Sequence, residues 1–290
     1  MGSATFSALL FADDLNEWCK DINNLEKIIK IMEHEFSRFG LYVSFKKTST
    51  QEWAARGKPE FSDRNSMFTI AGNEIENVTS SKVLGQMLNS ENEKGYVENR
   101  VAKSNGQYHR YKEVLSDWNV CRFTRVKFLE AYVRSTLLYG VCAEVPSESH
   151  IDALKTFWYT CLRKMSPGGF TRRTNENDEF MFNFKYTRND LDNYFSTPPI
   201  GQFIHVSFLK YVAHVVRRDA SHPTKQILFI QPDKKYAKSA VWRKVEFLLK
   251  PLCRDDIVKK MNDRAVFSEL LEDLYPYLTR RPSESTWLTD

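Results

Sequence analysis

Two adjacent carboxylates, Asp13 and Asp14, have the most specific chemistry in this chain. They follow a short apolar segment, residues 8–11, and the small residue Ala12. An apolar strand that ends in a tight turn with paired acids can hold divalent cations against a nucleoside triphosphate, as two-metal phosphoryl transfer requires. The alternative is structural, because acid pairs are common at turns and helix N-termini, where they accept hydrogen bonds from backbone amides.

The residues that follow predict the elements that would position this pair. Residues 21–39 carry apolar side chains at a helical period, and Gly40 supplies a C-terminal stop. Residues 41–45 are rich in aromatic and β-branched side chains and predict a strand that leads directly into Lys46 and Lys47. The expected order is strand, acidic turn, helix, strand and lysine.

A hairpin is expected farther along the chain. Residues 67–70 and 74–78 read as strands, and Gly72-Asn73 between them can provide the positive φ that a short reversal needs. Residues 83–87 form another short apolar element.

Helical periodicity dominates the remainder of the chain. Helices are predicted over residues 96–115, 123–139, 151–165 and 203–218, with a break at 117–119. The polar face of the first two would suit a helical domain that lies along a nucleic-acid backbone, although ordinary amphipathic helices look the same. The basic residues that we assign to this polar face are Arg100, Lys103, Arg110 and Lys112.

The net charge of +5 does not by itself identify a nucleic-acid-binding protein. Dibasic pairs recur along the chain, and a solvated surface would also produce some of them. The pairs Arg163-Lys164 and Arg172-Arg173 flank residues 166–170, a segment with glycine and an aromatic side chain. Such a basic, aromatic loop is the chemistry expected for contacting phosphates and stacking on bases.

Taken in order, these motifs resemble the reverse transcriptases of non-LTR (LINE-type) retrotransposons. Six segments of the family have counterparts here, in the same order. They are the Phe-Ala-Asp-Asp box, the Gly-Leu segment that ends in Lys-Thr, the primer grip, the thumb signature and two C-terminal segments. They lie at residues 11–14, 40–48, 83–85, 127–140, 162–165 and 209–217.

The resemblance implies roles for particular residues. Asp13 and Asp14 would be the catalytic acids and the ligands of Mg²⁺, and Lys47 would lie near the leaving pyrophosphate, where an ammonium can neutralise charge. A solvated lysine at a strand end is the alternative for Lys47. Leu84 and Gly85 would belong to the primer grip, although Val83 stands where the family usually has an aromatic residue.

The same resemblance implies that the fingers and the first catalytic Asp lie upstream of the acidic box. Because Met1 lies just before that box, we expect the chain alone to be inactive as an RNA-directed DNA polymerase and to be a truncated or remnant form. The implied partners are an RNA template, a DNA primer and deoxynucleoside triphosphates. Two alternatives remain, namely a non-catalytic module that binds RNA or an RNA/DNA hybrid and a decayed reading frame without a selected role.

The predicted fold class is α+β: a partial palm, with a small antiparallel sheet and a helix, is followed by a mainly α-helical thumb and a helical C-terminal domain. The predicted domains are residues 1–90, 91–174 and 175–290. With 42% hydrophobic residues the chain can form a core, and five scattered cysteines argue against a disulfide framework or a zinc site. No segment has the roughly 18 uninterrupted apolar residues of a membrane span, and no signal peptide is apparent. We therefore expect an intracellular protein, nuclear or cytoplasmic, without a membrane partner.

Overall fold

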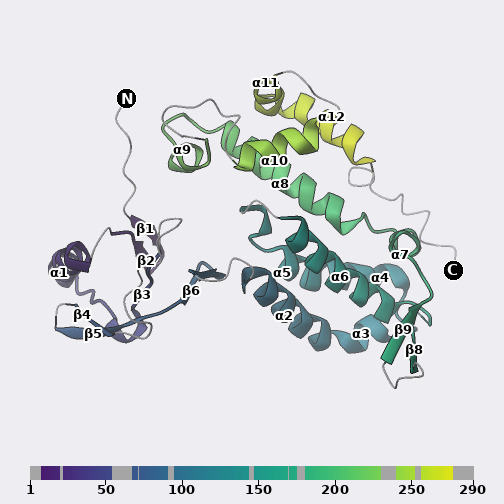
Figure 1. Ribbon diagram of the computed structural model, residues 1–290, viewed down its shortest axis with the longest axis horizontal. Coiled ribbons are helices and arrows are strands. Elements are labelled where there is room, and N and C mark those ends of the chain that lie inside the picture. The colour runs from purple at the N-terminus through teal and green to yellow at the C-terminus, as the bar shows by residue number, and fades with distance from the viewer. Residues whose placement is uncertain are drawn as a thin grey trace. The chain divides into compact units, whose positions relative to one another are not determined.

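The chain forms two compact units, Met1–Tyr96 and Val97–Asp290, which we call the N-terminal and C-terminal units. In this computed structural model the described residues are 8–19, 22–53, 67–70, 72–90, 95–143, 147–168, 170–174, 180–229, 240–251 and 256–276. The fold is mixed α+β, as the sequence predicts, with most strands in the N-terminal unit and most helices in the C-terminal unit (Figure 1).

Among its described residues, the N-terminal unit has three small sheets and one α-helix. Its elements are β1 (Ala8–Phe11), β2 (Asp14–Glu17), α1 (Ile22–Ser37), η1 (Phe45–Lys47), β3 (Ser49–Thr50), β4 (Met67–Ile70), β5 (Asn73–Asn77), β6 (Ser80–Val83) and β7 (Gln86–Asn89). The strand orders are β1-β2, β3-β5-β4 and β6-β7. All pairs are antiparallel except β3 with β5, which is parallel, so the unit is not the purely antiparallel sheet that we expected. Ile29, Ile70 and Ile75 form a small buried cluster in this unit.

The prediction of a strand over residues 41–45 is wrong. Gly40 ends the segment after α1 with a φ of 72°, as expected, but the next residues are irregular and lead into the 3-10 helix η1. Leu41 and Tyr42 are exposed, whereas Phe45 turns inward and packs against the isoleucine cluster. Residues with high β propensity form a strand only where a neighbouring strand can accept and donate their backbone hydrogen bonds. Here β5 makes its hydrogen bonds with Ser49 and Thr50 of β3 and not with residues 41–45.

The hairpin expected over residues 67–78 is confirmed, whereas residues 83–87, expected as one short apolar element, contain the turn of a second hairpin. β4 and β5 pair with Ile70 opposite Asn73, and Gly72 in the turn has a φ of 79°. β6 and β7 form a second hairpin, in which Leu84 and Gly85 have φ values of 48° and 80°. Positive φ at both turn positions is the type I′ pattern, and it strains Leu84 because a Cβ disfavours that conformation.

The C-terminal unit is mainly helical. Its elements are α2 (Gly95–Arg110, which begins at the unit boundary), α3 (Lys112–Ser116), α4 (Arg122–Phe128), the π-helix η2 (Leu129–Arg134), α5 (Ser135–Leu138), η3 (Val141–Ala143), α6 (Glu148–Met165), β8 (Phe170–Thr174), β9 (Phe180–Phe184), α7 (Arg188–Phe195), α8 (Ile200–Val216), α9 (Pro223–Phe229), α10 (Ala240–Leu249), α11 (Ile257–Asn262) and α12 (Arg264–Leu274). The four helical segments predicted from periodicity are confirmed, with the first divided into α2 and α3 and the second containing η2.

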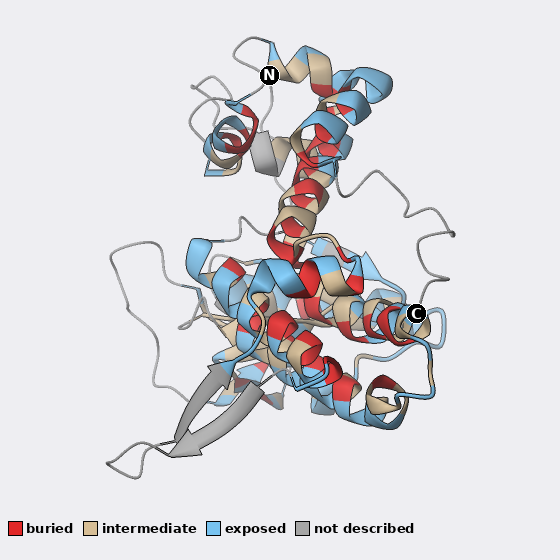
Figure 2. Ribbon diagram, turned by 90° about the vertical axis from the view of Figure 1, so that its right-hand side faces the viewer, coloured by how far each residue is buried: buried red, intermediate tan, exposed pale blue. Residues whose placement is uncertain are grey.

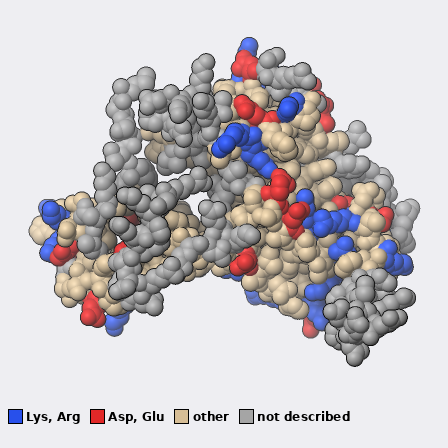
Figure 3. Space-filling model, in the orientation of Figure 1, with Lys and Arg blue, Asp and Glu red and all other residues tan. Residues whose placement is uncertain are grey.

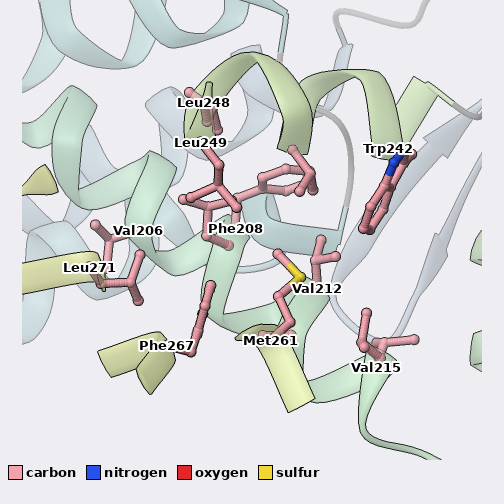
Figure 4. Close-up of a cluster of buried hydrophobic side chains, with 14 of the residues drawn as sticks. Val206, Phe208, Val212, Val215, Trp242, Leu248, Leu249, Met261, Phe267 and Leu271 are labelled. Atoms are coloured by element: carbon pink, nitrogen blue, oxygen red, sulfur yellow. The ribbon is translucent and has the colours of Figure 1, made fainter. Parts of the chain in front are cut away.

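The last helices share one apolar core. Side chains from α8, α10, α11 and α12 converge in it, including Phe208, Trp242, Met261 and Phe267 (Figure 4). Buried residues occur along most of the length of α8, in agreement with its high content of apolar residues (Figure 2). α8 is therefore the central helix of this part of the fold.

The two predicted domain boundaries have different outcomes. The division after residue 96 lies close to the predicted one at 90/91. The chain does not divide at 174/175, because β8 and β9 pair across that position with Thr174 opposite Phe180. Residues 175–179 are an acidic, polar run that predicts a linker or an exposed loop, and they lie outside the described residues.

No helix among the described residues has the length and apolar character needed to cross a bilayer.

Ser196 offers a test of the C-terminal end of α7. Its backbone is left-handed, with φ 50° and ψ 40°, and its N–H donates to the carbonyl oxygen of Asn193. Glycine has no Cβ to disfavour this conformation, so we expect Ser196→Gly to raise the free energy of unfolding by about 0.5–1 kcal/mol in urea denaturation. Ser196→Ala keeps a Cβ and is the matched control, for which we expect little change; equal stability of the two variants would contradict the prediction.

Candidate functional site

The acidic pair lies at the tip of the β1–β2 hairpin. Phe11 pairs with Asp14, so Ala12 and Asp13 form a two-residue turn. Ala12 has a φ of 53° and Asp13 is not left-handed, which is the φ pattern of a type II′ turn. Both carboxylates are exposed, and Phe11 beside them is 62% exposed. The turn therefore presents two adjacent acids on a short hairpin with accessible apolar residues.

These two acids suit a hard cation that brings further ligands with it. Mg²⁺ commonly binds through one or two carboxylates, with water and substrate phosphates completing its octahedron. Within the described part of the chain, no cluster of three or more His, Cys, Asp or Glu side chains could hold a metal ion. Two carboxylates supply only part of an octahedral coordination sphere, so a cation held by Asp13 and Asp14 would need further ligands from elsewhere.

Lys47 does not follow a strand, as the sequence predicts, but is the last residue of η1. Its backbone N–H donates to the carbonyl oxygen of Ser44 at 2.9 Å, and its side chain is exposed. Leu84 and Gly85, the predicted primer-grip residues, form the turn of the β6–β7 hairpin.

The basic residues predicted on α2 and α3 do not share one environment. Lys103, Arg110 and Lys112 are exposed, whereas Arg100 is only 5% exposed and its Cζ lies 4.6 Å from the centre of the Tyr139 ring. Burial lowers the pKa of Arg100. At 3.6 residues per turn, Lys103 and Arg110 lie on one face and Arg100 is rotated away from them toward the interior. The outward polar face predicted for Arg100 is therefore wrong.

Of the four basic residues predicted around residues 166–170, Arg163 and Lys164 end α6 and Arg172 and Arg173 lie on β8. The side chains of Arg172 and Arg173 lie outside the described parts of the structure. Lys164 is exposed, with its Nζ 5.1 Å from the centre of the Tyr108 ring, and Arg163 is half-buried. Residue 169, within the predicted loop, lies outside the described residues.

Arg163 belongs to a series of guanidinium groups that lie over aromatic rings of neighbouring elements. Figure 1 shows α4, α6, α7 and the β8–β9 hairpin together in one part of the C-terminal unit, and basic side chains gather over α4 and α7 in Figure 3. We call the following residues the arginine–aromatic surface: Arg122 over Tyr194 at 4.6 Å, Arg188 over Tyr159 at 5.4 Å and Arg163 over Phe184 at 4.2 Å, each measured from Cζ to the ring centre. Each pair joins two different elements, so the surface depends on how these elements pack.

A buried carboxyl group, Asp192, fixes the middle of this surface. The Tyr159 hydroxyl on α6 donates to Asp192 Oδ2 on α7 at 2.6 Å, and the Thr197 hydroxyl lies 3.5 Å from Oδ1. Asp192 is only 6% exposed, and this burial raises the pKa of its carboxyl group to about 6. The same burial and the hydrogen bond to Asp192 raise the pKa of the Tyr159 hydroxyl.

Local sequence explains why α7 begins where it does. Thr187 and Asp190 form a capping box, in which Asp190 Oδ2 accepts from the Thr187 N–H at 2.8 Å and from its hydroxyl at 2.7 Å. Arg188 is consequently the first helical residue, next to the capped end. A second anchor holds the end of α6, because the buried Arg125 donates through Nη1 to the Met165 carbonyl oxygen at 3.2 Å.

Sequence reasoning found Arg163 and missed Arg188, Tyr159, Asp192 and Phe184. The Thr-x-x-Asp pattern at 187–190 is a recognisable helix start and could have located Arg188 in a first helical turn. Nothing in the sequence indicates that Arg188 lies over Tyr159, because those residues belong to different helices.

Comparison with known proteins adds nothing to this geometry: no family model, no curated protein and no solved structure matches the chain.

The raised pKa of Asp192 predicts an unusual pH dependence of stability. The folded pKa of about 6 exceeds the ordinary value of 3.8, so the folded state binds more protons between these values. The contribution of Asp192 to the free energy of unfolding is therefore greatest below about pH 4 and falls as the pH rises through about 6. Between about pH 4 and 6 we expect the free energy of unfolding of wild type to fall by about 2–3 kcal/mol relative to that of Asp192→Asn. Urea denaturation at each pH measures this difference.

Asp190→Asn is the matched control, because the hydrogen bonds from Thr187 lower the pKa of this exposed carboxyl group. Its contribution should be present above the ordinary carboxyl pKa and decline as the pH falls, which is the opposite direction. A stability difference between wild type and Asp192→Asn that does not vary with pH would contradict the assignment.

Proposed function

We propose that this chain is part of an RNA-directed DNA polymerase of the non-LTR retrotransposon type, with Asp13 and Asp14 in its metal site. The observation that carries the proposal is the acidic pair at a two-residue hairpin turn, exposed and adjacent to apolar β1. The order of the sequence motifs supports the family assignment. The reaction class is RNA-templated transfer of a nucleotide to the 3′-hydroxyl of a DNA primer.

Asp13 and Asp14 would hold Mg²⁺ together with the triphosphate of a deoxynucleotide. When bound, the metal supplies charge neutralisation and orientation for in-line displacement at phosphorus. The contribution of the chain is the turn, which keeps two carboxylates adjacent on a short hairpin. In this proposal Lys47 remains a candidate for neutralising the leaving pyrophosphate, from the end of η1 rather than from a strand.

The C-terminal unit would hold the template and primer, as a thumb and the domain that follows it would. Exposed Lys103, Arg110, Lys112 and Lys164 and the arginine–aromatic surface support this role, because phosphate contacts require accessible cations. The same surface favours the alternative function, a module that binds RNA or an RNA/DNA hybrid without chemistry. Retention of a labelled RNA at about 0.1 M salt, declining steeply as salt increases, is expected for either function, and its absence would exclude the binding module.

A manganese titration tests the metal site directly. Mn²⁺ can stand in for Mg²⁺ and gives an electron paramagnetic resonance signal that decreases on binding. We expect the chain to retain Mn²⁺ more strongly when dTTP is present, because the triphosphate supplies the ligands that two carboxylates lack. Asp13→Asn with Asp14→Asn should abolish this nucleotide-dependent retention and leave the circular dichroism spectrum unchanged, since both side chains are exposed.

Glu272 and Asp273 provide the matched control. They are another adjacent, exposed pair of acids, but they lie on a helix, α12, and not at a hairpin turn. The Glu272→Gln, Asp273→Asn variant should retain Mn²⁺ and dTTP like wild type. Equal retention by the Asp13/Asp14 variant and wild type would refute the proposed metal site.

A further inference from the structure

We propose that Arg163 and Arg188 together form a binding site for the phosphodiester groups of a polynucleotide. This inference rests on the proposed nucleic-acid binding of the C-terminal unit and deepens it, because it names the contact and adds Arg188, which no motif indicates. It is independent of Asp13 and Asp14.

The two guanidinium groups come from different helices, and the charges of both act on the Tyr159 hydroxyl. Arg188 begins α7 and lies over the Tyr159 ring, and Tyr159 precedes Arg163 by one turn on the same face of α6. The positive charge of Arg188 lowers the pKa of Arg163, in addition to the larger effect of burial. Two cations therefore lie close enough to repel one another.

No protein carboxylate neutralises this pair in the described part of the chain. Neither guanidinium group has an ion pair or a hydrogen bond there, and the buried Nε of Arg163 has no partner. The two nearest acids in sequence are already engaged, since Asp190 accepts from Thr187 and Asp192 from Tyr159. Two neighbouring cations without counter-charge favour binding of an anion.

The aromatic rings hold both guanidinium groups in place before a ligand arrives. Arg163 lies over Phe184 and Arg188 over Tyr159, and Tyr159 is itself fixed by its hydrogen bond to Asp192. Stacking restricts the rotamers of a guanidinium group but leaves its edge N–H groups available for a planar, two-point contact with phosphate oxygens. Less conformational entropy is then lost on binding.

The surroundings favour a polymer over a free phosphate ion. Phe184 is 57% exposed beside Arg163, and the positive surface continues to Arg122 over Tyr194 and to exposed Lys164 and Lys185. An extended series of cations with an accessible aromatic ring suits a backbone with repeated phosphates and adjacent bases.

The salt dependence of RNA binding tests the inference on the full chain. Fluorescence anisotropy with a labelled single-stranded RNA gives the affinity between about 50 and 200 mM salt. Each phosphate contact contributes about 0.7 to the slope of log affinity against log salt, so the Arg163→Gln, Arg188→Gln variant should show a slope smaller by about 1.4. The effect should not depend on the RNA sequence.

Two further variants separate this contact from general charge. Arg163→Lys with Arg188→Lys keeps both charges but loses planarity, so it should restore the slope while leaving the affinity below that of wild type. Lys210→Gln with Lys259→Gln removes the same charge from exposed positions on α8 and α11 and should leave the slope unchanged. Thermal melting of each variant verifies that it is folded.

Three results would overturn the inference. One is an unchanged slope in the folded Arg163/Arg188 glutamine variant, and another is an equal decrease in the Lys210/Lys259 variant. If millimolar inorganic phosphate displaced RNA at matched ionic strength, the ligand of Arg163 and Arg188 would be a free phosphate ion and not a polynucleotide. Failure of wild type to bind RNA at low salt would overturn both this inference and the binding role, whereas the manganese titration reports separately on Asp13 and Asp14.

Discussion

The arginine–aromatic surface depends on one hydrogen bond, from the Tyr159 hydroxyl to the buried carboxyl group of Asp192. It joins α6 to α7 where both are otherwise apolar, and a buried polar group without its partner would cost about 1–3 kcal/mol. The Tyr159 hydroxyl and the Asp192 carboxyl group are each stabilised only when they are hydrogen-bonded to one another, and this bond fixes the position of α7 against α6. The Tyr159 ring that carries Arg188 is thereby fixed as well.

Helix ends provide the second constraint on this surface. The capping box of Thr187 and Asp190 begins α7, and the Arg125 guanidinium group satisfies the Met165 carbonyl oxygen at the end of α6. Arg125 is itself buried, with its Cζ 4.6 Å from the centre of the Trp118 ring. Buried Arg125 thus joins the end of α6 to α4, whereas Arg122, Arg163 and Arg188 lie over rings and remain at least partly exposed.

The N-terminal unit is organised differently. Its buried apolar cluster is small, centred on Ile29, Ile70 and Ile75, and its hairpins rely on local turn geometry. Ala12 and Leu84 hold positive φ values without being glycine, which costs roughly 1–2 kcal/mol at each position.

The sequence by itself determined the α+β class, a turn after β1, the β4–β5 hairpin and the main helices, because periodicity and turn residues act over a few neighbouring positions. It did not indicate β2, which begins at Asp14 and comes between this turn and α1. It failed at residues 41–45, where a strand needed a partner that was already paired with β3. It also failed at Arg100, which is buried and lies over the Tyr139 ring, and at 174/175, where β8 and β9 pair across the expected boundary. Only the tertiary structure decided that Arg188 and Arg163 share the environment of Tyr159, because helix packing brings together residues whose separation in sequence carries no local signal.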